Sequence, residues 1–455
     1  MEKKKRNALP VVLFAVAGIA LIALVIMILM VLKVGPFAEG SAKEKKRVLH
    51  TSANGIETMD NGYMRKDLSA SELTVLMGNG INLGNTMEAY GRISLGTEAP
   101  VSSYETFWSQ PVTTQEMITG MKNAGFDTLR IPVAWTNAMD YESGDYTIRE
   151  DYLNRVEEII NYALNENMYV VINDHWDGSW WGMFGSASEE TRQKAWDLYT
   201  SMWTQIAERY KEYSDYLIFE SANEELGNRL NDTDVAADSG TLSADECYEM
   251  TLKINQKFVD IVRGTGGNNE SRFLLIAGYN TDVDMTTDDR YIMPTDPANE
   301  VNKLILSVHY YTPWGYCGNE SLSLWGTKRN YGEMNSLLES LTKFTDQGYG
   351  VIIGEYGVLV KSDGTLKKNA ALYYKNFLDN CDLYNFCPLL WDCNNLYNRQ
   401  DCKIIDDEIA ALYKERAYAN EAAMTDEEKA ARPDKIKAEM DQAYADAPAA
   451  FDDGA

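Results

Sequence analysis

"YLIFESANEEL" (residues 216–226) joins a short apolar run to a cluster of carboxylates and an asparagine. The apolar part has the length and composition of a buried β-strand. Glu220, Asn223, Glu224 and Glu225 follow at the point where that strand meets its loop. In closed parallel barrels the active site lies at the carboxyl ends of the strands. The segment therefore raises the question of whether other strands of this chain end in complementary side chains.

Short apolar runs of the same kind recur along the chain and alternate with longer amphipathic stretches. The alternation predicts an α/β fold with a parallel sheet, and eight units in about 345 residues fit a closed (β/α)8 TIM barrel. An open doubly wound sheet is the alternative, but no glycine-rich phosphate turn follows the first strand. Strands are predicted at 78–84, 125–133, 168–173, 216–220, 272–278, 303–308, 350–355 and 386–391, and helices at 113–124, 150–166, 188–212, 244–263, 331–347, 368–380 and 406–416.

The charge and cysteine content restrict the possible partners. The chain has 455 residues and a formal net charge of −27. This acidic balance excludes nucleic acid, whose binding proteins carry basic patches, and it suits a neutral partner such as a polysaccharide. The six cysteines include no C-x-x-C pair, so a zinc site is not expected. Buried free thiols are predicted, and one or two disulfides are the alternative.

The amino terminus carries the clearest targeting signal. Residues 1–7 are basic, and an uncharged apolar run of 25 residues follows at 8–32. Such a run is long enough to cross a bilayer as a helix, which predicts a membrane anchor at residues 1–32. A cleaved signal segment is the alternative, because Gly40-Ser41-Ala42 has the small residues of a cleavage site. We therefore expect a single-pass protein of the cell membrane with an extracellular catalytic domain, or a secreted protein.

Composition divides the remainder of the chain. Residues 33–70 are polar and charged and are predicted to form a linker. Residues 71–418 contain the alternating pattern and form the predicted (β/α)8 catalytic domain. Residues 419–455 are rich in alanine and acidic residues and are predicted to be a helical or disordered tail.

A second carboxylate stands at the end of the seventh predicted strand. Glu355 follows "GVIIG" (350–354), so Glu355 and Glu224 would face each other across the mouth of a barrel. Glycoside hydrolysis needs such a pair, one carboxyl that is protonated and one that is ionised. A separation of about 5–5.5 Å gives retention of configuration, and about 6.5–9.5 Å gives inversion.

Other strand ends supply polar and aromatic side chains. Arg130 ends the second strand, His175 follows the third, His309 and Tyr311 follow the sixth, and Trp391 ends the eighth. Each of these residues has a structural alternative, but together they form an ordered set around one rim. Tryptophans in the loops after the strands are predicted to extend a groove: Trp135, Trp180, Trp181, Trp314 and Trp325. The two strand-end histidines lie on separate strands, and no H-x-H or H-E-x-x-H motif occurs, so no metal or other cofactor is expected. A metal-dependent barrel hydrolase is the alternative.

Seven stretches resemble glycoside hydrolase family 5, the cellulase family. They are "GINLGNTMEA" (80–89), "LRIPVAW" (129–135), "NDHWDG" (173–178), "FESANEEL" (219–226), "SVHYYTPW" (307–314), "IIGEYG" (352–357) and "LLWDCN" (389–394). The resemblance implies a retaining mechanism with Glu224 as acid/base and Glu355 as nucleophile. It implies that Asn223 holds the sugar 2-hydroxyl, that Arg130 and Tyr311 contact Glu355, and that His309 orients Glu224. His175 would bind in the −1 subsite, and Trp391 would form its floor.

Two positions depart from the family pattern. Glu225 follows Glu224 where many relatives have proline, and we expect its side chain to point outward. An inward orientation would instead raise the pKa of the acid. Trp176 stands where relatives with "HYYTPW" often carry a second histidine, which bears on the substrate preference.

The leading hypothesis is an exported endo-β-1,4-glucanase that acts on cellulose, mixed-linkage glucan or xyloglucan. A β-mannanase or another endo-β-glycanase of the same family is an alternative, because the subsite loops set specificity. A non-catalytic surface glycan-binding protein is the alternative from a different class. We expect a monomer whose partners are a β-glucan and, through the amino-terminal helix, a membrane.

Overall fold

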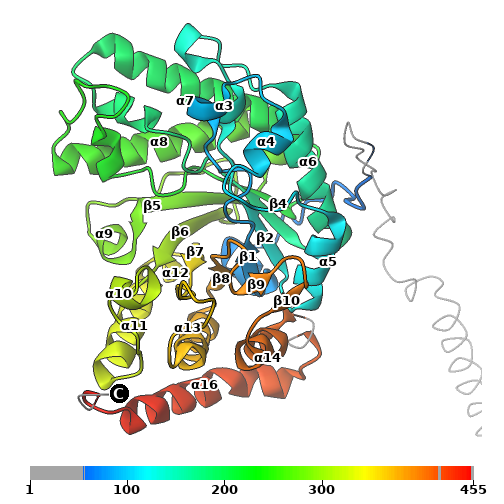
Figure 1. Cartoon of the computed structure of the whole chain (residues 1–455), viewed down its shortest axis with the longest axis vertical. Helices are drawn as coiled ribbons and strands as arrows, with labels where there is room; N and C mark the ends of the chain where they lie inside the picture. The colour runs from blue at the N-terminus through cyan, green and yellow to red at the C-terminus, as the bar shows by residue number, and fades with distance from the viewer. Residues whose placement is uncertain (1–54, 56, 419–421, 452–455) are drawn as a thin grey trace, which may run out of the picture. The chain divides into compact units, whose positions relative to one another are not determined.

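The computed structural model describes residues 55, 57–418 and 422–451 (Figure 1). Eight parallel strands close into a barrel in the order β1 to β8, because β1 pairs with both β2 and β8. This closed barrel confirms the predicted (β/α)8 fold. The strands are β1 (Gly80–Asn82), β2 (Thr128–Ile131), β3 (Tyr169–Ile172), β4 (Leu217–Glu220), β5 (Leu274–Asp282), β6 (Leu304–Tyr310), β7 (Gly350–Tyr356) and β8 (Cys387–Leu390). A separate antiparallel pair, β9 (Tyr397–Asn398) and β10 (Lys403–Ile404), follows β8.

Helices surround the strands, and several begin at side-chain caps. Thr114 caps α5, and Ser243 forms a capping box with Glu246 at α8. The predicted helix at 331–347 is divided at Leu341 into α11 and α12. The helices are α2 (Ala70–Leu76), α3 (Arg92–Leu95), α4 (Val101–Glu105), α5 (Gln115–Asn123), α6 (Glu150–Asn165), α7 (Glu189–Tyr210), α8 (Ala244–Gly264), α9 (Val283–Thr287), α10 (Trp314–Cys317), α11 (Lys328–Ser340), α12 (Thr342–Thr345), α13 (Ala370–Tyr384), α14 (Asp407–Arg416) and α16 (Asp426–Asp446).

The interior of the barrel is apolar at one end and polar at the other. Alternate strand residues point inward, and the inward-facing Val171, Ile218 and Ile352 pack against Leu73 of α2. Helix α2 therefore closes the end of the barrel where the strands begin. One step further along the strands the inward positions hold polar residues, which are Asn82, Arg130, Glu220 and Ser307, all fully buried. This polar layer lies beneath the carboxyl ends of the strands.

The segment before α2 lies against the barrel. Asp60 accepts hydrogen bonds from the backbone and side chain of Ser214, and Arg65 pairs with Asp215 at 2.9 Å. The described residues from 57 onward thus pack on the barrel, although the sequence placed them in the linker at 33–70. The reason is that Asp60 and Arg65 find buried partners in the turn before β4, which sequence composition does not show.

The carboxyl-terminal tail contains the long helix α16, which starts at a capping box formed by Thr425 and Glu428. It lies across α11 and α13 (Figure 1) and buries Ile436 and Met440. Arg432 pairs with Asp382 at 2.6 Å. The described part of the tail is therefore helical, which is one of the two predicted forms, and this helix packs on the barrel.

All six cysteines lie in the described residues and are free thiols, as predicted; four are buried as expected, whereas Cys393 and Cys402 are partly exposed. Within the described ranges no helix has the length and apolarity needed to cross a membrane. The predicted anchor at residues 1–32 lies outside those ranges.

Candidate active site

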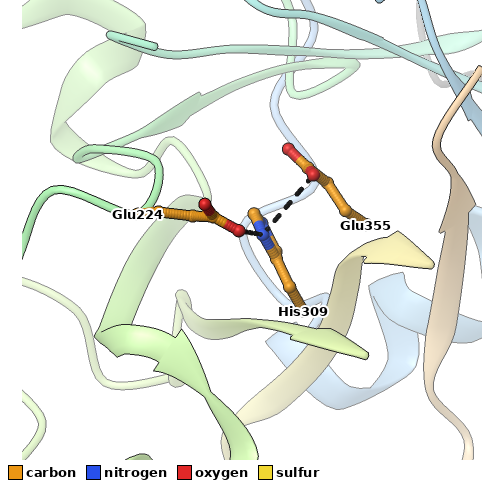
Figure 2. A group of neighbouring side chains, drawn as sticks. All are labelled: Glu224, His309 and Glu355. Carbon is orange, nitrogen blue, oxygen red and sulfur yellow. Dashed lines mark hydrogen bonds and ion pairs between the residues drawn. The ribbon is translucent and has the colours of Figure 1, made fainter. Parts of the chain in front are cut away.

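Glu224 and Glu355 converge at the carboxyl ends of β4 and β7, with His309 from β6 between them (Figure 2). One oxygen of each carboxyl group and one ring nitrogen of His309 lie within 4.8 Å of one another. His309 Nδ1 is 2.8 Å from Glu224 Oε1 and 3.6 Å from Glu355 Oε2. The Glu224 side chain is 41% exposed and that of Glu355 is 7% exposed. The structure thus brings the two predicted carboxylates together, one open to solvent and one buried.

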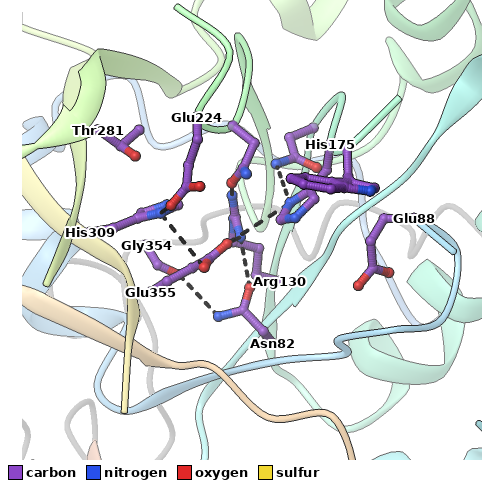
Figure 3. A network of polar contacts seen from close by, with 12 residues as sticks. Asn82, Glu88, Arg130, His175, Glu224, Thr281, His309, Gly354 and Glu355 are labelled. Atoms are coloured by element: carbon purple, nitrogen blue, oxygen red, sulfur yellow. Dashed lines mark hydrogen bonds and ion pairs between the residues drawn. The ribbon is translucent and has the colours of Figure 1, made fainter. Parts of the chain in front are cut away.

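Arg130 organises the buried side of the site (Figure 3). Its Nη1 donates to Glu355 Oε1 at 3.0 Å and to Asn82 Oδ1 at 2.8 Å. Its Nη2 donates to Asn223 Oδ1 at 2.7 Å, and its Nε donates to Glu220 Oε2 at 2.7 Å. A planar guanidinium can hold several acceptors in one fixed arrangement. Arg130 therefore positions Glu355 and Asn223 together, and Glu220 supplies the charge that makes its burial possible.

Tyr311 and Arg130 hold the two oxygens of Glu355. Tyr311 Oη donates to Glu355 Oε2 at 3.0 Å, while Arg130 donates to Oε1. Burial raises the pKa of Glu355 above its ordinary value, and the charges of His309 and Arg130 limit that rise. Both oxygens are oriented, and Oε2 also faces His309.

The pKa values of His309 and Glu224 move in opposite directions. Burial lowers the pKa of His309, but the neighbouring carboxylates Glu355 and Glu224 outweigh burial and raise it above its ordinary value. Burial raises the pKa of Glu224, but the hydrogen bond and charge of His309 outweigh burial and lower it. Without substrate, the proton between the two residues therefore resides on His309.

His175 and Trp391 form one wall of the site. Their rings stack with centroids 5.6 Å apart and planes inclined by 12°. His175 Nδ1 lies 3.9 Å from Glu355 Oε1. Burial and the charge of Arg130 lower the pKa of His175 well below its ordinary value, so the ring is neutral. Both predicted residues are thus at the site, and Trp391 is partly exposed to it.

A cleft of about 490 Å³ lies above these residues. Both carboxylates line it, together with Tyr311 and Trp391. Trp314, which is 61% exposed, lines it as the sequence predicted. Trp108 and Trp176 also line the cleft but were not predicted to do so. Trp176 directly follows His175, and this adjacency was an available signal.

The other four tryptophans predicted to line the groove do not reach it. Trp135, Trp180, Trp181 and Trp325 are fully buried, so that prediction is wrong. Short 3₁₀ helices, η2 (Trp135–Ala138) and η4 (Trp180–Gly185), turn three of them into the core. Trp135 Nε1 donates to the carbonyl of Asn173 at 2.8 Å, and Trp180 stacks on Trp181 with centroids 4.3 Å apart.

Glu225 is fully buried, so the prediction that it points outward is wrong. Its Oε2 accepts the backbone N–H of Asn223 at 2.8 Å, and its Oε1 accepts that of Trp176 at 3.1 Å. Burial raises the pKa of Glu225 to about 7. The side chain turns inward because these two backbone donors need an acceptor. Glu88, which sequence reasoning also missed, lines another part of the cleft (Figure 3), and burial raises its pKa to about 7.

Among the residues that the structure describes, Glu224, His309 and Glu355 form one group that could hold a metal ion. A histidine nitrogen and two carboxylates suit several divalent cations. An ion at this position would have to replace the 2.8 Å hydrogen bond between His309 and Glu224. The group can therefore hold either the shared proton or a cation.

Comparisons with known proteins agree with this geometry. The sequence profile of the family described as Cellulase (glycosyl hydrolase family 5) matches residues 94–396. Endoglucanase A of Paenibacillus barcinonensis is 36% identical over 375 residues, which span 76% of this chain and 87% of that protein. A xyloglucan-specific endo-β-1,4-glucanase of Bacteroides ovatus is 33% identical over 352 residues, which span 73% of this chain and 66% of that protein.

Solved structures are similar as well. A broad-specificity endoglucanase from Ruminococcus champanellensis with bound cellotriose superposes with a TM-score of 0.66 at 30% identity, covering 76% of this chain and 99% of that one. The Bacteroides ovatus xyloglucanase in complex with a heptasaccharide gives a TM-score of 0.66 at 29% identity, covering 78% of each chain. On this evidence the chain is a glycoside hydrolase that belongs to the cellulase family, glycosyl hydrolase family 5.

Proposed function

We propose that the protein is a retaining endo-β-1,4-glucanase that hydrolyses internal bonds of β-glucans. The spacing of Glu224 and Glu355 carries the proposal, because their nearest oxygens lie within 4.8 Å. Retaining enzymes hold their two carboxyl groups about 5–5.5 Å apart, whereas inverting enzymes leave about 6.5–9.5 Å for a water molecule. A spacing of this size supports retention.

Glu355 acts as the nucleophile. Arg130 and Tyr311 hold its two oxygens, so the carboxylate is aimed before substrate arrives. One oxygen forms a bond to the anomeric carbon while the bond from that carbon to the leaving oxygen breaks. In the second step water attacks the anomeric carbon and the ester bond to Glu355 breaks.

Glu224 acts as acid and then as base. His309 holds the required proton one hydrogen bond away, at 2.8 Å. When a sugar excludes water from the cleft, a neutral His309 and a protonated Glu224 become favourable relative to the ion pair. Glu224 then donates the proton to the leaving oxygen, and in the second step it takes a proton from the attacking water.

Asn223, His175 and Trp391 bind the sugar that is attacked. Arg130 fixes the Asn223 carbonyl oxygen, so the Asn223 amide N–H is free to donate to the 2-hydroxyl. Trp391 offers a partly exposed ring in the cleft, and the ring of His175 stacks with it. Hydrogen bonds to the 2-hydroxyl that strengthen in the transition state accelerate hydrolysis.

The experiment is a product profile on carboxymethylcellulose, barley β-glucan, xyloglucan, glucomannan and mannan, with the anomer of the first product followed by NMR. We expect turnover of the glucans with the β-anomer formed first, and no turnover by Glu355→Gln, whose fold stays intact by circular dichroism. Preference for mannan would instead support the β-mannanase alternative. A wild-type-like rate in the variant would reject Glu355 as nucleophile, and an inactive wild type that binds glucan would support the non-catalytic alternative.

A chelator distinguishes the metal-dependent alternative. The proposed mechanism uses the proton between His309 and Glu224, so we expect EDTA treatment followed by dialysis to leave the rate on β-glucan unchanged. Loss of activity that added divalent cation restores would show that Glu224, His309 and Glu355 hold an ion.

A further inference from the structure

Trp176 combines an unusual backbone with an exposed ring. Its φ is +48°, in the left-handed region that bulky residues rarely occupy. Its side chain is nevertheless 49% exposed and lines the cleft. A large apolar side chain gains little stability from such a position, and backbone strain of this kind concentrates at binding and catalytic sites. The combination suggests that the ring is presented to a ligand.

A buried carboxylate holds this conformation. Glu225 Oε1 accepts the Trp176 N–H at 3.1 Å, and Glu225 Oε2 accepts the Asn223 N–H at 2.8 Å. Glu225 is fully buried. Its hydrogen bond to Asn223 is therefore buried, and its hydrogen bond to Trp176 is partly buried. One side chain therefore links the backbone of Trp176 to the backbone of Asn223, which lies beside Glu224.

Arg229 covers one face of the indole. Its guanidinium carbon lies over the Trp176 ring, 5.1 Å from the centroid, which is within cation–π distance. Asp232 holds Arg229 by a hydrogen bond of 3.1 Å, and Glu225 lies 3.7 Å from its Nη1. Because Arg229 covers one face of the indole ring, the opposite face is the one available to a ligand in the cleft.

We propose that Trp176 is a stacking platform for a gluco-configured pyranose unit next to the scissile bond, and that Glu225 is the positioning residue that presents it. This inference rests on the proposed glucanase function. A β-linked glucose unit carries its hydroxyls equatorially and its C–H bonds toward both faces, so it offers an apolar face to the indole. The polar groups for the neighbouring sugar already lie at Glu224 and Asn223, so the site needs only a flat apolar surface here.

The first test compares Trp176→Gly and Trp176→Phe with the wild type on barley β-glucan and cellohexaose. Glycine adopts φ +48° without strain, so Trp176→Gly should unfold at the same temperature as the wild type or higher. Loss of the stacked area should raise KM about tenfold and change kcat less than about twofold. Trp176→Phe, which keeps an aromatic face, should recover part of the affinity. A wild-type KM in Trp176→Gly would overturn the proposal.

The second test is a double-mutant cycle between Glu225→Gln and Trp176→Gly. If Glu225 acts on binding through Trp176, Glu225→Gln should raise KM in the wild-type background and leave it unchanged in the Trp176→Gly background. Trp314→Ala serves as the matched control, because Trp314 lines the cleft from a different element, α10, and its effect on KM should add to that of Glu225→Gln. Additive effects of Glu225→Gln and Trp176→Gly on KM would overturn the positioning role of Glu225.

The two proposals can be distinguished. A wild type without glucanase activity would overturn both the proposed function and the stacking role of Trp176. An active wild type whose KM is unaffected by these substitutions would overturn the stacking role alone.

Discussion

At the residue scale, three carboxylates of one short segment serve different purposes. Glu220 points into the barrel and balances the charge of Arg130. Glu224 faces the cleft and bonds to His309. Glu225 is buried and accepts two backbone N–H groups. The environment of each carboxylate, and not its residue type, sets its role.

The acid role of Glu224 can be tested by the dependence on the leaving group. Glu224→Ala should lose about 10²–10⁴-fold in rate on β-glucan, whose leaving alcohol needs a proton. The loss should be far smaller on a 2,4-dinitrophenyl cellobioside, whose leaving group departs without protonation. Steady-state rates on both substrates measure the difference, and equal losses would remove Glu224 from the acid role.

The pKa shifts predict a bell-shaped dependence of kcat/KM on pH. Glu355 must be ionised, and its pKa lies above the ordinary value of 4.5, so activity should disappear as pH falls through that raised pKa. The proton shared by His309 and Glu224 must be present. The pKa of His309 is raised above its ordinary value of 6.5, so activity should disappear as pH rises through this raised pKa.

Tyr311→Phe removes a donor to Glu355 and should move the acid limb to higher pH without moving the alkaline limb. An unchanged acid limb in that variant would contradict the assignment of this limb to Glu355.

At the element scale, α2 is expected to contribute to stability without affecting activity, because it packs at the end of the barrel opposite the two carboxylates. It closes the amino-terminal end of the barrel, with Leu73 fully buried among inward-facing strand residues. The carboxylates lie at the opposite ends of the strands. Packing at α2 should therefore contribute to the free energy of unfolding and leave the geometry of the site unchanged.

Leu73→Ala should lower the free energy of unfolding by about 2–5 kcal/mol, because it removes buried methyl groups and leaves a cavity. Leu76→Ala, on the same helix but partly buried, should cost less. Urea unfolding measures both, and kcat/KM well below the unfolding transition should stay at the wild-type value. If both variants lowered the free energy of unfolding equally, the packing of Leu73 inside the barrel would not be the main contribution of α2 to stability.

At the scale of the whole molecule, we propose that the protein acts at the cell surface. We propose that residues 1–32 anchor the chain with its catalytic domain outside, so that soluble products form beside the cell. The formal net charge of the whole chain, −27, favours solubility.

Fractionation tests this arrangement. In cells that express the full chain, activity should remain in the membrane fraction after a carbonate wash and should be lost when protease is added to intact cells. A chain that lacks residues 1–47 should be released into the soluble fraction with the same specific activity. Full-chain activity in the culture supernatant would favour a cleaved signal segment.

The order of elements and the residues at the strand ends followed from the sequence itself. Arg130, His175, Glu224, His309 and Glu355 each end or follow an apolar run, and closure of a parallel barrel brings all strand ends to one rim. Successive side chains of a strand point to opposite faces in regular alternation. The position of a residue in a strand therefore determines whether its side chain points into the barrel near the rim.

The tertiary structure alone decided where loop side chains point and how far apart the carboxylates lie. Trp176 is exposed at the cleft while Trp180 and Trp181, a few residues later, are buried, and Glu225 turns inward beside the partly exposed Glu224. Loops have no periodicity, so the direction of a side chain depends on backbone angles such as the φ of Trp176 and on partners distant in sequence. The distance between Glu224 and Glu355, whose nearest oxygens lie within 4.8 Å, likewise depends on the register and curvature of the closed sheet, which no local pattern of residues encodes.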